Sequence, residues 1–398
     1  VQRTLLTRAV AEHAGVDRAV IAHRMMGGLE PTAAGLERLL AAEAGDADAL
    51  IPYPFMLAAA LESPPEDLGP VADWILEWKW DGIRAQLVRR DEVSMVWSRG
   101  EEPLDRAFPE IAAVARALPA GTVLDGEIVA WEHERPLPFG MLQQRLGRTD
   151  AAPMLFPEVP VRFLAFDLLE AGGVDRRPRP LHERRAELQR IVEAMADEHL
   201  RESPSLAEAD WSAAARRRAT GREVGTEGLM LKHRESPYRV GRVRGDWWKW
   251  KLDPYTVDAV LVAAQPGHGR RAGLLTDYTF AVWDGEDLVP IAQAYSDLTD
   301  AEIRAVDRQL RSSIVARRGP WRQVEPRLVF EIAFEGIQAS RRHRSGVALR
   351  FPRMHRWRTD KSPAEADRLE TLTAMLAGPS GDRPGGHPGE RPGGSLAP

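Results

Sequence analysis

Short runs rich in apolar residues follow one another through the middle of the chain, and charged or turn-forming residues separate the runs. Such short runs predict strands. From residue 52 onward, the expected strands span 74–80, 83–89, 93–98, 122–131 and 161–169. Helices are expected at 108–117 and 180–209, and the alternating arginines and glutamates of the second predict a largely exposed helix. This order predicts a mixed α+β domain built on antiparallel sheets.

A second domain is expected beyond a boundary near Asp253-Pro254. Its strands are predicted at 257–264, 279–283, 288–294 and 328–334. Asp284-Gly285 is a hairpin turn signal, and Thr299 with Glu302 forms a capping box that begins a helix running to about residue 314. Several short strands with one helix predict a small barrel of the OB type.

The two ends of the chain differ from this central pattern. Residues 1–51 have helical spacing, and we expect them to be the remnant of a larger helical domain. Near the other end, Ser362 and Glu365 form a capping box from which a last helix is expected to run until just before Gly378. Residues 379–398 are rich in proline and glycine and are expected to be disordered.

Composition and charge narrow the classes of protein. The 398 residues include no apolar run long enough to cross a membrane. The absence of cysteine excludes disulfides, thiolate nucleophiles and cysteine-bound zinc, and it fits a cytoplasmic protein. A net charge of -5 argues against a nucleic-acid partner for the chain as a whole. The segment 341–361 differs, because it holds seven arginines and one lysine against a single acid, Asp360, and such a cluster suits phosphates.

Candidate chemistry begins at Glu77-Trp78-Lys79-Trp80-Asp81-Gly82, where a lysine stands between two tryptophans at the end of a predicted strand. Partial desolvation by aromatic neighbours favours the neutral amine, so Lys79 is a candidate nucleophile. The alternative is a half-buried lysine paired with Glu77 or Asp81 on an exposed strand. These six residues alone do not separate the two interpretations.

Other candidate residues lie on or just after predicted strands. Glu127 and Glu227 are carboxylates of the kind that suits Mg²⁺. Lys249 and Lys251 share one face of a strand, where they suit a triphosphate and disfavour the positive charge of a nearby lysine. Phe166 is an aromatic that can stack on a purine. The plainer interpretations are surface ion pairs for the carboxylates and a core aromatic for Phe166. No Walker sequence or dinucleotide-binding GxGxxG occurs, which excludes the usual phosphate loops.

Seven short motifs, in one order along the chain, resemble those of the ATP-dependent DNA ligases. They are Lys79-Trp80-Asp81-Gly82, Ser98-Arg99-Gly100, Asp125-Gly126-Glu127, Phe163 to Asp167, Glu227-Gly228 to Lys232, Lys249-Trp250-Lys251 and Arg350-Phe351-Pro352-Arg353. The resemblance covers about residues 52–375. The sequence at 267–273 and 277–285 is similar to that of the bacterial branch called cisplatin damage response DNA ligases. The resemblance implies an adenylation domain at 52–254 and an OB-fold domain at 255–378, behind a remnant of a DNA-binding domain.

The resemblance also implies a reaction. Lys79 attacks the α-phosphate of ATP, AMP passes from the lysine to the 5′-phosphate of a nick, and the 3′-hydroxyl then seals the strand. The implied cofactor is Mg²⁺, held by Glu127 and Glu227, and the implied partner is nicked double-stranded DNA, bound by a monomer that acts in DNA repair without membrane association. Nucleotide contacts are implied for Glu77, Arg84, Arg99, Glu127, Phe166, Lys249, Lys251, Arg350 and Arg353. A further arginine is expected some six residues before Lys249, where Arg242 and Arg244 are both candidates and we favour Arg244.

Two alternative functions stay open. An RNA ligase or a capping guanylyltransferase shares the chemistry, and the capping alternative is disfavoured by the helical front segment and by the basic block 350–361. A non-catalytic nucleic-acid-binding barrel is disfavoured because Lys79, Glu127 and Lys249 occur together. Labelling of the polypeptide by ATP or by GTP distinguishes these possibilities.

Overall fold

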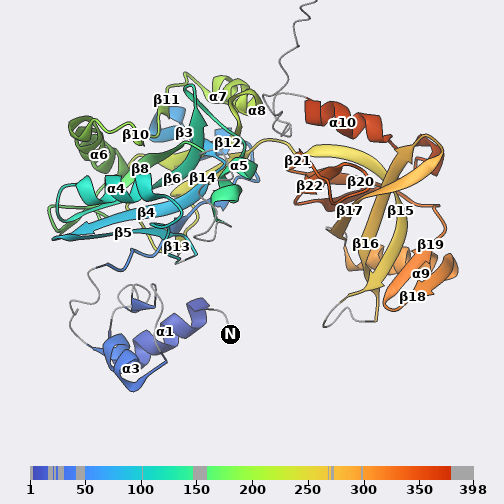
Figure 1. Cartoon of the computed structure of the whole chain (residues 1–398), viewed down its shortest axis with the longest axis horizontal. Coiled ribbons are helices and arrows are strands. Elements are labelled where there is room, and N and C mark those ends of the chain that lie inside the picture. Colours follow the sequence, from blue (N-terminus) through green and yellow to red (C-terminus); the bar gives the residue numbers. More distant parts are fainter. Residues whose placement is uncertain are drawn as a thin grey trace, which may run out of the picture. The chain divides into compact units, whose positions relative to one another are not determined.

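The chain divides into two compact units, Val1–Leu252 and Asp253–Pro398 (Figure 1). The structure is a computed structural model, and it describes residues 3–16, 21, 24–25, 31–41, 50–100, 102–146, 159–267, 269, 273–296 and 299–377. The helices α1 (Arg3–Ala14) and α3 (Ala33–Leu40) fall in the segment expected to be helical. The tail expected to be disordered, 379–398, lies outside the described residues.

Two sheets build the first unit from residue 52 onward. The larger has the strand order β10-β8-β6-β4-β5, with β7 on β6 and β9 on β8, and the smaller has the order β11-β3-β12-β14-β2. The strands of the larger sheet are β4 (Ile83–Arg90), β5 (Val93–Ser98), β6 (Thr122–Glu132), β7 (Arg135–Pro136), β8 (Val161–Ala171), β9 (Val174–Asp175) and β10 (Leu200–Glu202). Those of the smaller sheet are β2 (Ala59–Ala60), β3 (Trp74–Trp80), β11 (Ser205–Leu206), β12 (Thr226–His233) and β14 (Trp247–Lys251). A separate pair joins β1 (Met56–Leu57) to β13 (Gly241–Arg242).

Alternating apolar residues of the larger sheet build the main core of this unit. Leu87, Leu124 and Phe163 are fully buried there with Ile111 of α4 (Pro109–Ala117). The other helices are α5 (Phe139–Leu146), α6 (Leu181–Met195), α7 (Trp211–Ala219) and α8 (Gly221–Val224). The α+β class is confirmed, although β10 pairs with β8 and β2 with β14 in parallel, so the sheets are mixed rather than purely antiparallel.

The long helix predicted at 180–209 is shorter than expected. The helix α6 ends at Met195, because Ala196 adopts a left-handed φ of 48°. The next residues turn back into the larger sheet, where β10 pairs with β8. Pro204 follows that strand and lacks the backbone N–H that a continuing helix requires.

The same helix is also less exposed than its charge pattern predicts. Arg184 and Arg185 are buried on the face that meets the sheet. Asp167 receives two hydrogen bonds from Arg184, at 2.7 and 2.9 Å, and Glu77 receives one from Arg185 at 3.0 Å. Buried guanidinium groups are tolerated where carboxylates pair with them, and these carboxylates come from strands distant in sequence.

Five strands of the second unit close into a barrel. The strand β15 pairs with both β16 and β20, β16 pairs with β17, and β23 joins β17 in parallel to β20. Their bounds are β15 (Tyr255–Pro266), β16 (Leu275–Asp284), β17 (Asp287–Ser296), β20 (Val329–Phe334) and β23 (Arg353–Trp357). Phe280, Phe330 and Ile332 fill the interior. This strand order, with α9 (Asp300–Ser312) between the third and fourth strands, confirms the OB fold.

Several shorter elements surround the barrel. Two hairpins, β18 (Ile314–Arg318) with β19 (Trp321–Val324) and β21 (Gly336–Ala339) with β22 (Val347–Arg350), were not expected from the sequence. The capping box at Thr299 and Glu302 forms as predicted at the start of α9. The box at Ser362 and Glu365 also forms, but it caps a single 3₁₀ turn, and the last helix, α10 (Leu369–Ala377), begins later. None of the helices in the described part of the chain is long and apolar enough to span a membrane.

Candidate active site

The strand β3 sends its alternate side chains to opposite faces of the smaller sheet. Trp78 and Trp80 belong to an apolar cluster with Leu229 on one face. Lys79 projects from the other face, with 22% of its side chain exposed. The tryptophans therefore do not surround Lys79. The inference that they desolvate its amine is wrong, because adjacent residues of a strand point to opposite faces of the sheet.

Lys79 pairs with a carboxylate from the neighbouring strand. Its Nζ donates to Glu227 of β12, rather than to Glu77 on its own strand. The strand β12 is irregular between Thr226 and Leu229, where it pairs with β3. Gly228 has a φ of +125° there, and a Cβ at this position would lie 2.3 Å from the carbonyl oxygen of Trp250. A bulge re-aims side chains, so the glycine allows Glu227 to reach Lys79.

Lys249 and Lys251 project from the same face as Lys79. Met230 of β12 lies directly opposite both Glu77 of β3 and Lys249 of β14. Directly opposed residues of antiparallel strands point to one face, which also places Lys251, two residues on, on that face. The structure thus gathers three lysines on one face of the smaller sheet.

The larger sheet contributes carboxylates and an arginine to the same site. Arg84 of β4 holds Asp125 through Nη2 at 2.7 Å and Nε at 3.1 Å, and the hydroxyl of Tyr238 donates to Asp125 at 2.7 Å. Glu127 of β6 lies directly opposite Arg84. Burial raises the pKa of Glu127 to about 7, against the opposing charges of Lys79 and Arg84. The side chains of the two sheets therefore share one electrostatic site.

Glu77 lies on the face of Lys79, in a deeper position with 1% of its surface exposed. It accepts hydrogen bonds from Lys232 Nζ at 3.0 and 3.1 Å and from Arg185 Nη1 at 3.0 Å. Burial lowers the pKa of Lys232, and the charge of Glu77 opposes that effect. Sequence reasoning placed Lys232 in a motif but assigned it no role, and it missed Arg185, which lay in a helix expected to be exposed.

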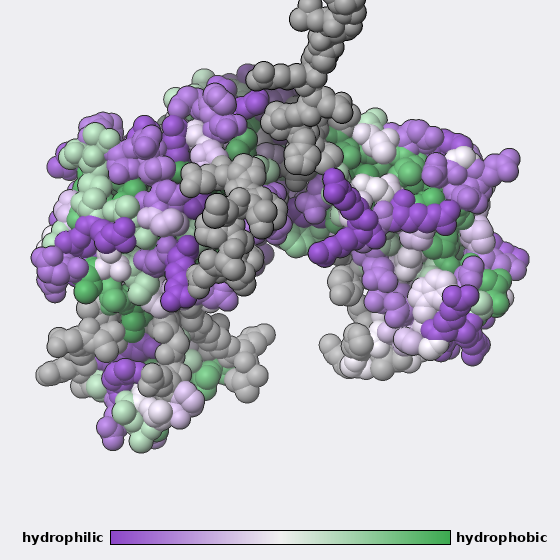
Figure 2. Space-filling view, viewed as in Figure 1, coloured by the Kyte–Doolittle hydropathy of each residue, from purple (hydrophilic) through white to green (hydrophobic). Residues whose placement is uncertain are grey.

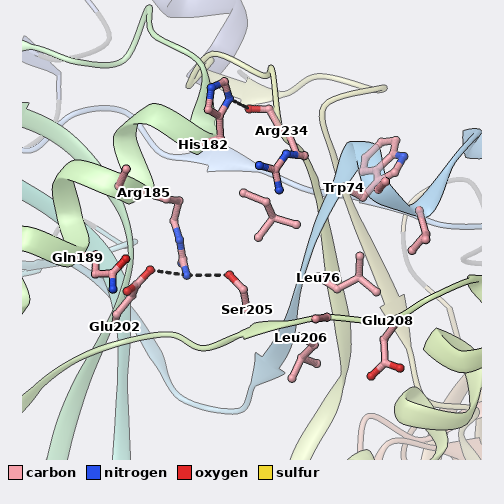
Figure 3. A pocket seen from close by; sticks show the side chains of 15 residues that line it. Trp74, Leu76, His182, Arg185, Gln189, Glu202, Ser205, Leu206, Glu208 and Arg234 are labelled. Carbon is pink, nitrogen blue, oxygen red and sulfur yellow. Dashed lines mark hydrogen bonds and ion pairs between the residues drawn. The ribbon is translucent and has the colours of Figure 1, made fainter.

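Arg185 also reaches the wall of a cavity of about 530 Å³ lined by residues of α6 and of strands β3 and β11 of the smaller sheet. Figure 3 shows its bonds to Glu202 and Ser205, at 2.7 and 3.2 Å. Both Nη atoms have at least two acceptors, since Arg185 also donates to Glu77 and to the backbone carbonyls of Phe166 and Ser203. Arg185 links α6 to β3 and leaves no terminal nitrogen for a ligand in this cavity.

Phe166 is 8% exposed and is surrounded by cations. Lys232 Nζ lies 3.9 Å from its ring centroid and Arg84 Cζ lies 5.4 Å from it, while Trp247 approaches edge-on at 6.3 Å. Cations over a ring face are favourable contacts that stacking by a purine would have to replace. Stacking of adenine on Phe166 stays a prediction.

The remaining arginines expected in the first unit are exposed. The backbone N–H of Arg99 donates to the carbonyl of Arg84 at 3.0 Å, which ties the loop after β5 to β4. Arg242 lies in β13, and Arg244 is 75% exposed, 3.8 Å from Glu62. A surface pair of this kind contributes little to stability. The preference for Arg244 over Arg242 stays a prediction.

In the second unit, Arg350 and Arg353 flank the turn from β22 to β23. Phe351, between them, has a φ of +50° and is 63% exposed, and Arg350 Cζ lies 5.4 Å from its ring centroid. Arg353 Nη1 lies 3.9 Å from Glu335. A non-glycine residue in the left-handed region is uncommon, and such strain is often found at functional sites.

The basic segment 341–361 is less uniform than its sequence indicates. Asp258 of β15 accepts from Arg358 at 2.7 Å and from Lys361 at 2.6 Å. Arg356 lies 3.3 Å from Glu331 of β20. The expectation that Asp360 alone opposes the segment is therefore wrong, because the barrel brings in carboxylates from distant strands.

Glu127 and Glu227 are the carboxylates expected to hold Mg²⁺. Glu227 pairs with Lys79, and the charges of Lys79 and Glu227 both act on Glu127. Within the described ranges, no group of three or more His, Cys, Asp or Glu residues is arranged to hold a metal ion. Mg²⁺ is usually held by one or two carboxylates together with substrate phosphates, and this pair fits the ion in that manner.

A lysine paired with a carboxylate between two sheets, followed by a five-stranded OB barrel, defines a nucleotidyltransferase domain joined to an OB-fold domain. The family model described as "ATP dependent DNA ligase domain" matches residues 55–251, and that described as "ATP dependent DNA ligase C terminal region" matches residues 271–361. A "Probable DNA ligase" of Anaeromyxobacter dehalogenans is 34% identical over 389 residues, which are 94% of this chain and 74% of that protein. The chain belongs to the ATP-dependent DNA ligase family.

Other relatives extend the comparison. A "Probable DNA ligase" of Koribacter versatilis is 41% identical over 341 residues, which are 80% of this chain and 59% of that protein. The chain thus spans less than two thirds of the length of this relative. A solved structure from a study of Lig E DNA ligases matches 77% of this chain and 100% of that one, with a TM-score of 0.54 and 20% identity, and this likeness concerns the fold alone.

Proposed function

We propose that the chain seals nicks in double-stranded DNA with ATP, through a lysyl-adenylate and then a DNA-adenylate. The observation that carries the proposal is the position of Lys79. Its amine meets Glu227 on a sheet face that also holds Lys249 and Lys251, opposite the Arg84 and Glu127 wall. The family supports ATP as the nucleotide.

In the first step, neutral Lys79 Nζ attacks the α-phosphorus of ATP. An N–P bond forms, the bond from the α-phosphorus to the bridging oxygen of the β-phosphate breaks, and pyrophosphate leaves. Lys79 loses one proton before the attack, which makes its amine neutral, and a second proton as the N–P bond forms. The adjacent Glu227 carboxylate is positioned to receive one of these protons, and the other passes to solvent. In the ion pair the amine of Lys79 is held by the Glu227 carboxylate. The pair must therefore separate before the amine can attack ATP.

Positioning and charge stabilisation account for most of the catalysis of phosphoryl transfer. Lys249 and Lys251 are suited to the α-phosphate, and the exposed Arg99 and Arg244 to phosphate or ribose. The buried Glu77 and Phe166 are assigned to the base end of the site, and Arg84, which holds Asp125, lies over the ring of Phe166. Arg350 and Arg353 are assigned to the pyrophosphate leaving group.

Glu127 and Glu227 would hold Mg²⁺ together with the phosphates of the nucleotide, and the ion would neutralise the charge that develops on the phosphate oxygens. The protein's own contribution is to keep Glu127 close to ionisation near neutral pH. Burial raises its pKa, and Lys79 and Arg84 limit the rise to about 7. Glu127 can therefore be a neutral acid without a cation and a carboxylate with one.

The later steps use nicked duplex DNA. An oxygen of the 5′-phosphate attacks the adenylate phosphorus, the N–P bond breaks, and Lys79 regains its amine. The 3′-hydroxyl then attacks the 5′-phosphate, releases AMP and closes the backbone. A role in DNA repair in the cytoplasm, by a monomer of the cisplatin damage response branch, belongs to this proposal.

Incubation with Mg²⁺ and α-labelled ATP or GTP, followed by acid precipitation, tests the proposal. Labelling by ATP and sealing of a nicked DNA duplex support it. Preferential labelling by GTP would favour a capping enzyme, and sealing confined to nicked RNA would favour an RNA ligase. A folded protein that takes no label from either nucleotide contradicts the enzymatic proposal.

A further inference from the structure

A basic cavity lies beside the OB barrel, and none of its lining residues belongs to the seven motifs that resemble those of the DNA ligases. It has a volume of about 320 Å³, and its polar lining consists of Arg311 of α9, Arg317 of β18 and Arg322 of β19. Leu274, Leu275 and Ile314 form its apolar walls. Figure 2 shows hydrophilic surface at the end of the unit where Figure 1 places α9 and β18.

Two of these arginines face each other across the hairpin. Arg317 and Arg322 are directly opposed in the antiparallel β18–β19 ladder. Like charges at directly opposed positions destabilise a sheet. Among the residues that the structure describes, no carboxylate pairs with either side chain, and Arg322 donates only to the backbone carbonyls of Gly319 and Trp321. The hairpin thus keeps a repulsive pair that an anion would relieve.

The guanidinium of the third arginine, Arg311, is held by hydrogen bonds to other residues of the unit. Arg311 donates from Nε to Asp307 at 2.7 Å and from Nη2 to the carbonyl of Gly273 at 2.6 Å. Asp307 is buried and also accepts the backbone N–H of Leu275 at 2.8 Å, so the carboxylate is held by the barrel. These contacts occupy Nε and Nη2 and fix the orientation of the guanidinium. Its remaining nitrogen, Nη1, is thus part of a preorganised group at the cavity.

We infer that this cavity binds a backbone phosphate of duplex DNA through Arg311, Arg317 and Arg322. The inference rests on the proposed function and adds to it a DNA contact on the OB unit, outside the motif Arg350-Phe351-Pro352-Arg353. Guanidinium forks match phosphate oxygens in geometry as well as charge. The apolar walls suit the deoxyribose next to the phosphate, which is why a phosphodiester fits this cavity better than a free inorganic anion.

The test compares the double variant Arg317→Ala/Arg322→Ala with Arg304→Ala. Arg304 is an exposed arginine of the same helix as Arg311 and does not line the cavity, so its variant shows the effect of removing one positive charge outside the cavity. Binding is measured on a nicked duplex with a 2′,3′-dideoxy end, which cannot be sealed, between about 50 and 200 mM salt. Each lost phosphate contact lowers the slope of log K against log salt by about 0.9.

The double variant is expected to lose roughly one unit of this slope and to bind several-fold more weakly. Arg304→Ala should keep the wild-type slope. Because the double variant removes a repulsive pair, its melting temperature should not fall, and its self-adenylation should be unchanged since neither arginine belongs to the proposed nucleotide site. A folded double variant with the wild-type slope overturns the inference.

A second arm distinguishes a free anion from DNA. Inorganic pyrophosphate is titrated into the wild type and the double variant by calorimetry. If only pyrophosphate binding is lost and the DNA slope is kept, the cavity takes a free anion and the inference is wrong. A wild-type protein that takes no label from ATP is a failure of the proposed function, and the DNA slope remains a separate measurement of the cavity.

Discussion

Glu77 and Lys232 form a buried ion pair beneath the candidate nucleotide site, with 1% of each side chain exposed and distances of 3.0 and 3.1 Å from Nζ to the two carboxylate oxygens. Arg185 is a second partner of Glu77, and Lys232 also lies over the ring of Phe166. Lys232 donates to both oxygens of Glu77, whereas Arg185 pairs with Glu202 as well as with Glu77. Because the two partners differ in this way, single substitutions of Glu77 and of Lys232 should have different effects on stability.

Glu77→Gln should destabilise the first unit more than Lys232→Met. Loss of the Glu77 carboxylate removes the group to which buried Lys232 donates, and breaking a buried pair in this way costs about 3–5 kcal/mol. Loss of Lys232 leaves Glu77 paired with Arg185. Chemical denaturation of both single variants and the double variant measures the difference. Equal losses in the two single variants would contradict the described network.

Gly228→Ala should be far more damaging than Gly245→Ala. Both glycines have positive φ, at +125° and +106°, so both substitutions incur backbone strain of about 1–3 kcal/mol. Only at position 228 would the new Cβ meet backbone, 2.3 Å from the carbonyl oxygen of Trp250. Gly228→Ala is expected to lower both the melting temperature and self-adenylation, because it displaces Glu227. Similar melting temperatures for the two variants would show that the close approach is absent.

Glu127 should make stability depend on pH in the absence of Mg²⁺ and nucleotide. Its pKa rises from 4.5 to about 7 on folding, so the folded protein binds the proton more tightly. The stabilising contribution is fully present below pH 4.5 and is lost as the pH rises through about 7. Glu127→Gln stays neutral, so its melting temperature relative to wild type should increase between about pH 5 and 8, by a few degrees. A constant difference across this range would contradict the raised pKa.

Arg350→Ala and Arg353→Ala should each impair self-adenylation by about a hundredfold, while sealing of a pre-adenylated nick changes much less. The pyrophosphate leaving group exists only in the first step, so a group that orients it affects only that step. Arg356→Ala is the matched control, because Arg356 pairs with Glu331 on the barrel. Equal losses in both steps would contradict the leaving-group role.

The sequence predicted much of the fold because its local signals agree with the tertiary structure. Strands at 74–80 and 93–98 form with the expected bounds, since both runs are rich in aromatic and aliphatic residues that favour strands, although 74–80 is buried on both faces. The prediction of a helix at 180–209 was wrong for its second half, where a left-handed Ala196 and the pairing of β10 with β8 override local propensity. The hairpins β18–β19 and β21–β22 have strands of four or five residues, too short for a periodic signal.

The candidate site, like the fold, was predicted only in part from the sequence. The order of the motifs identified Lys79, Glu127, Glu227, Lys249 and Lys251, which the two sheets bring to one site. What the sequence could not provide were partners from distant segments. Arg185 reaches Glu77 across 108 residues, and Asp258 neutralises Arg358 and Lys361 across 100 and 103 residues. Charge patterns along the chain do not reveal such pairs, because burial and pairing depend on strand order.

The central claim is that Lys79 becomes covalently adenylated. The chain contains five lysines, which makes the position of a label easy to assign. Lys361→Ala is the control, because Lys361 pairs with Asp258 in the other unit. With α-labelled ATP and Mg²⁺, wild type and Lys361→Ala should carry covalent, alkali-stable label on the peptide containing Lys79, and Lys79→Ala should carry none. Undiminished labelling of folded Lys79→Ala, or label on another lysine in the wild type, would contradict the account.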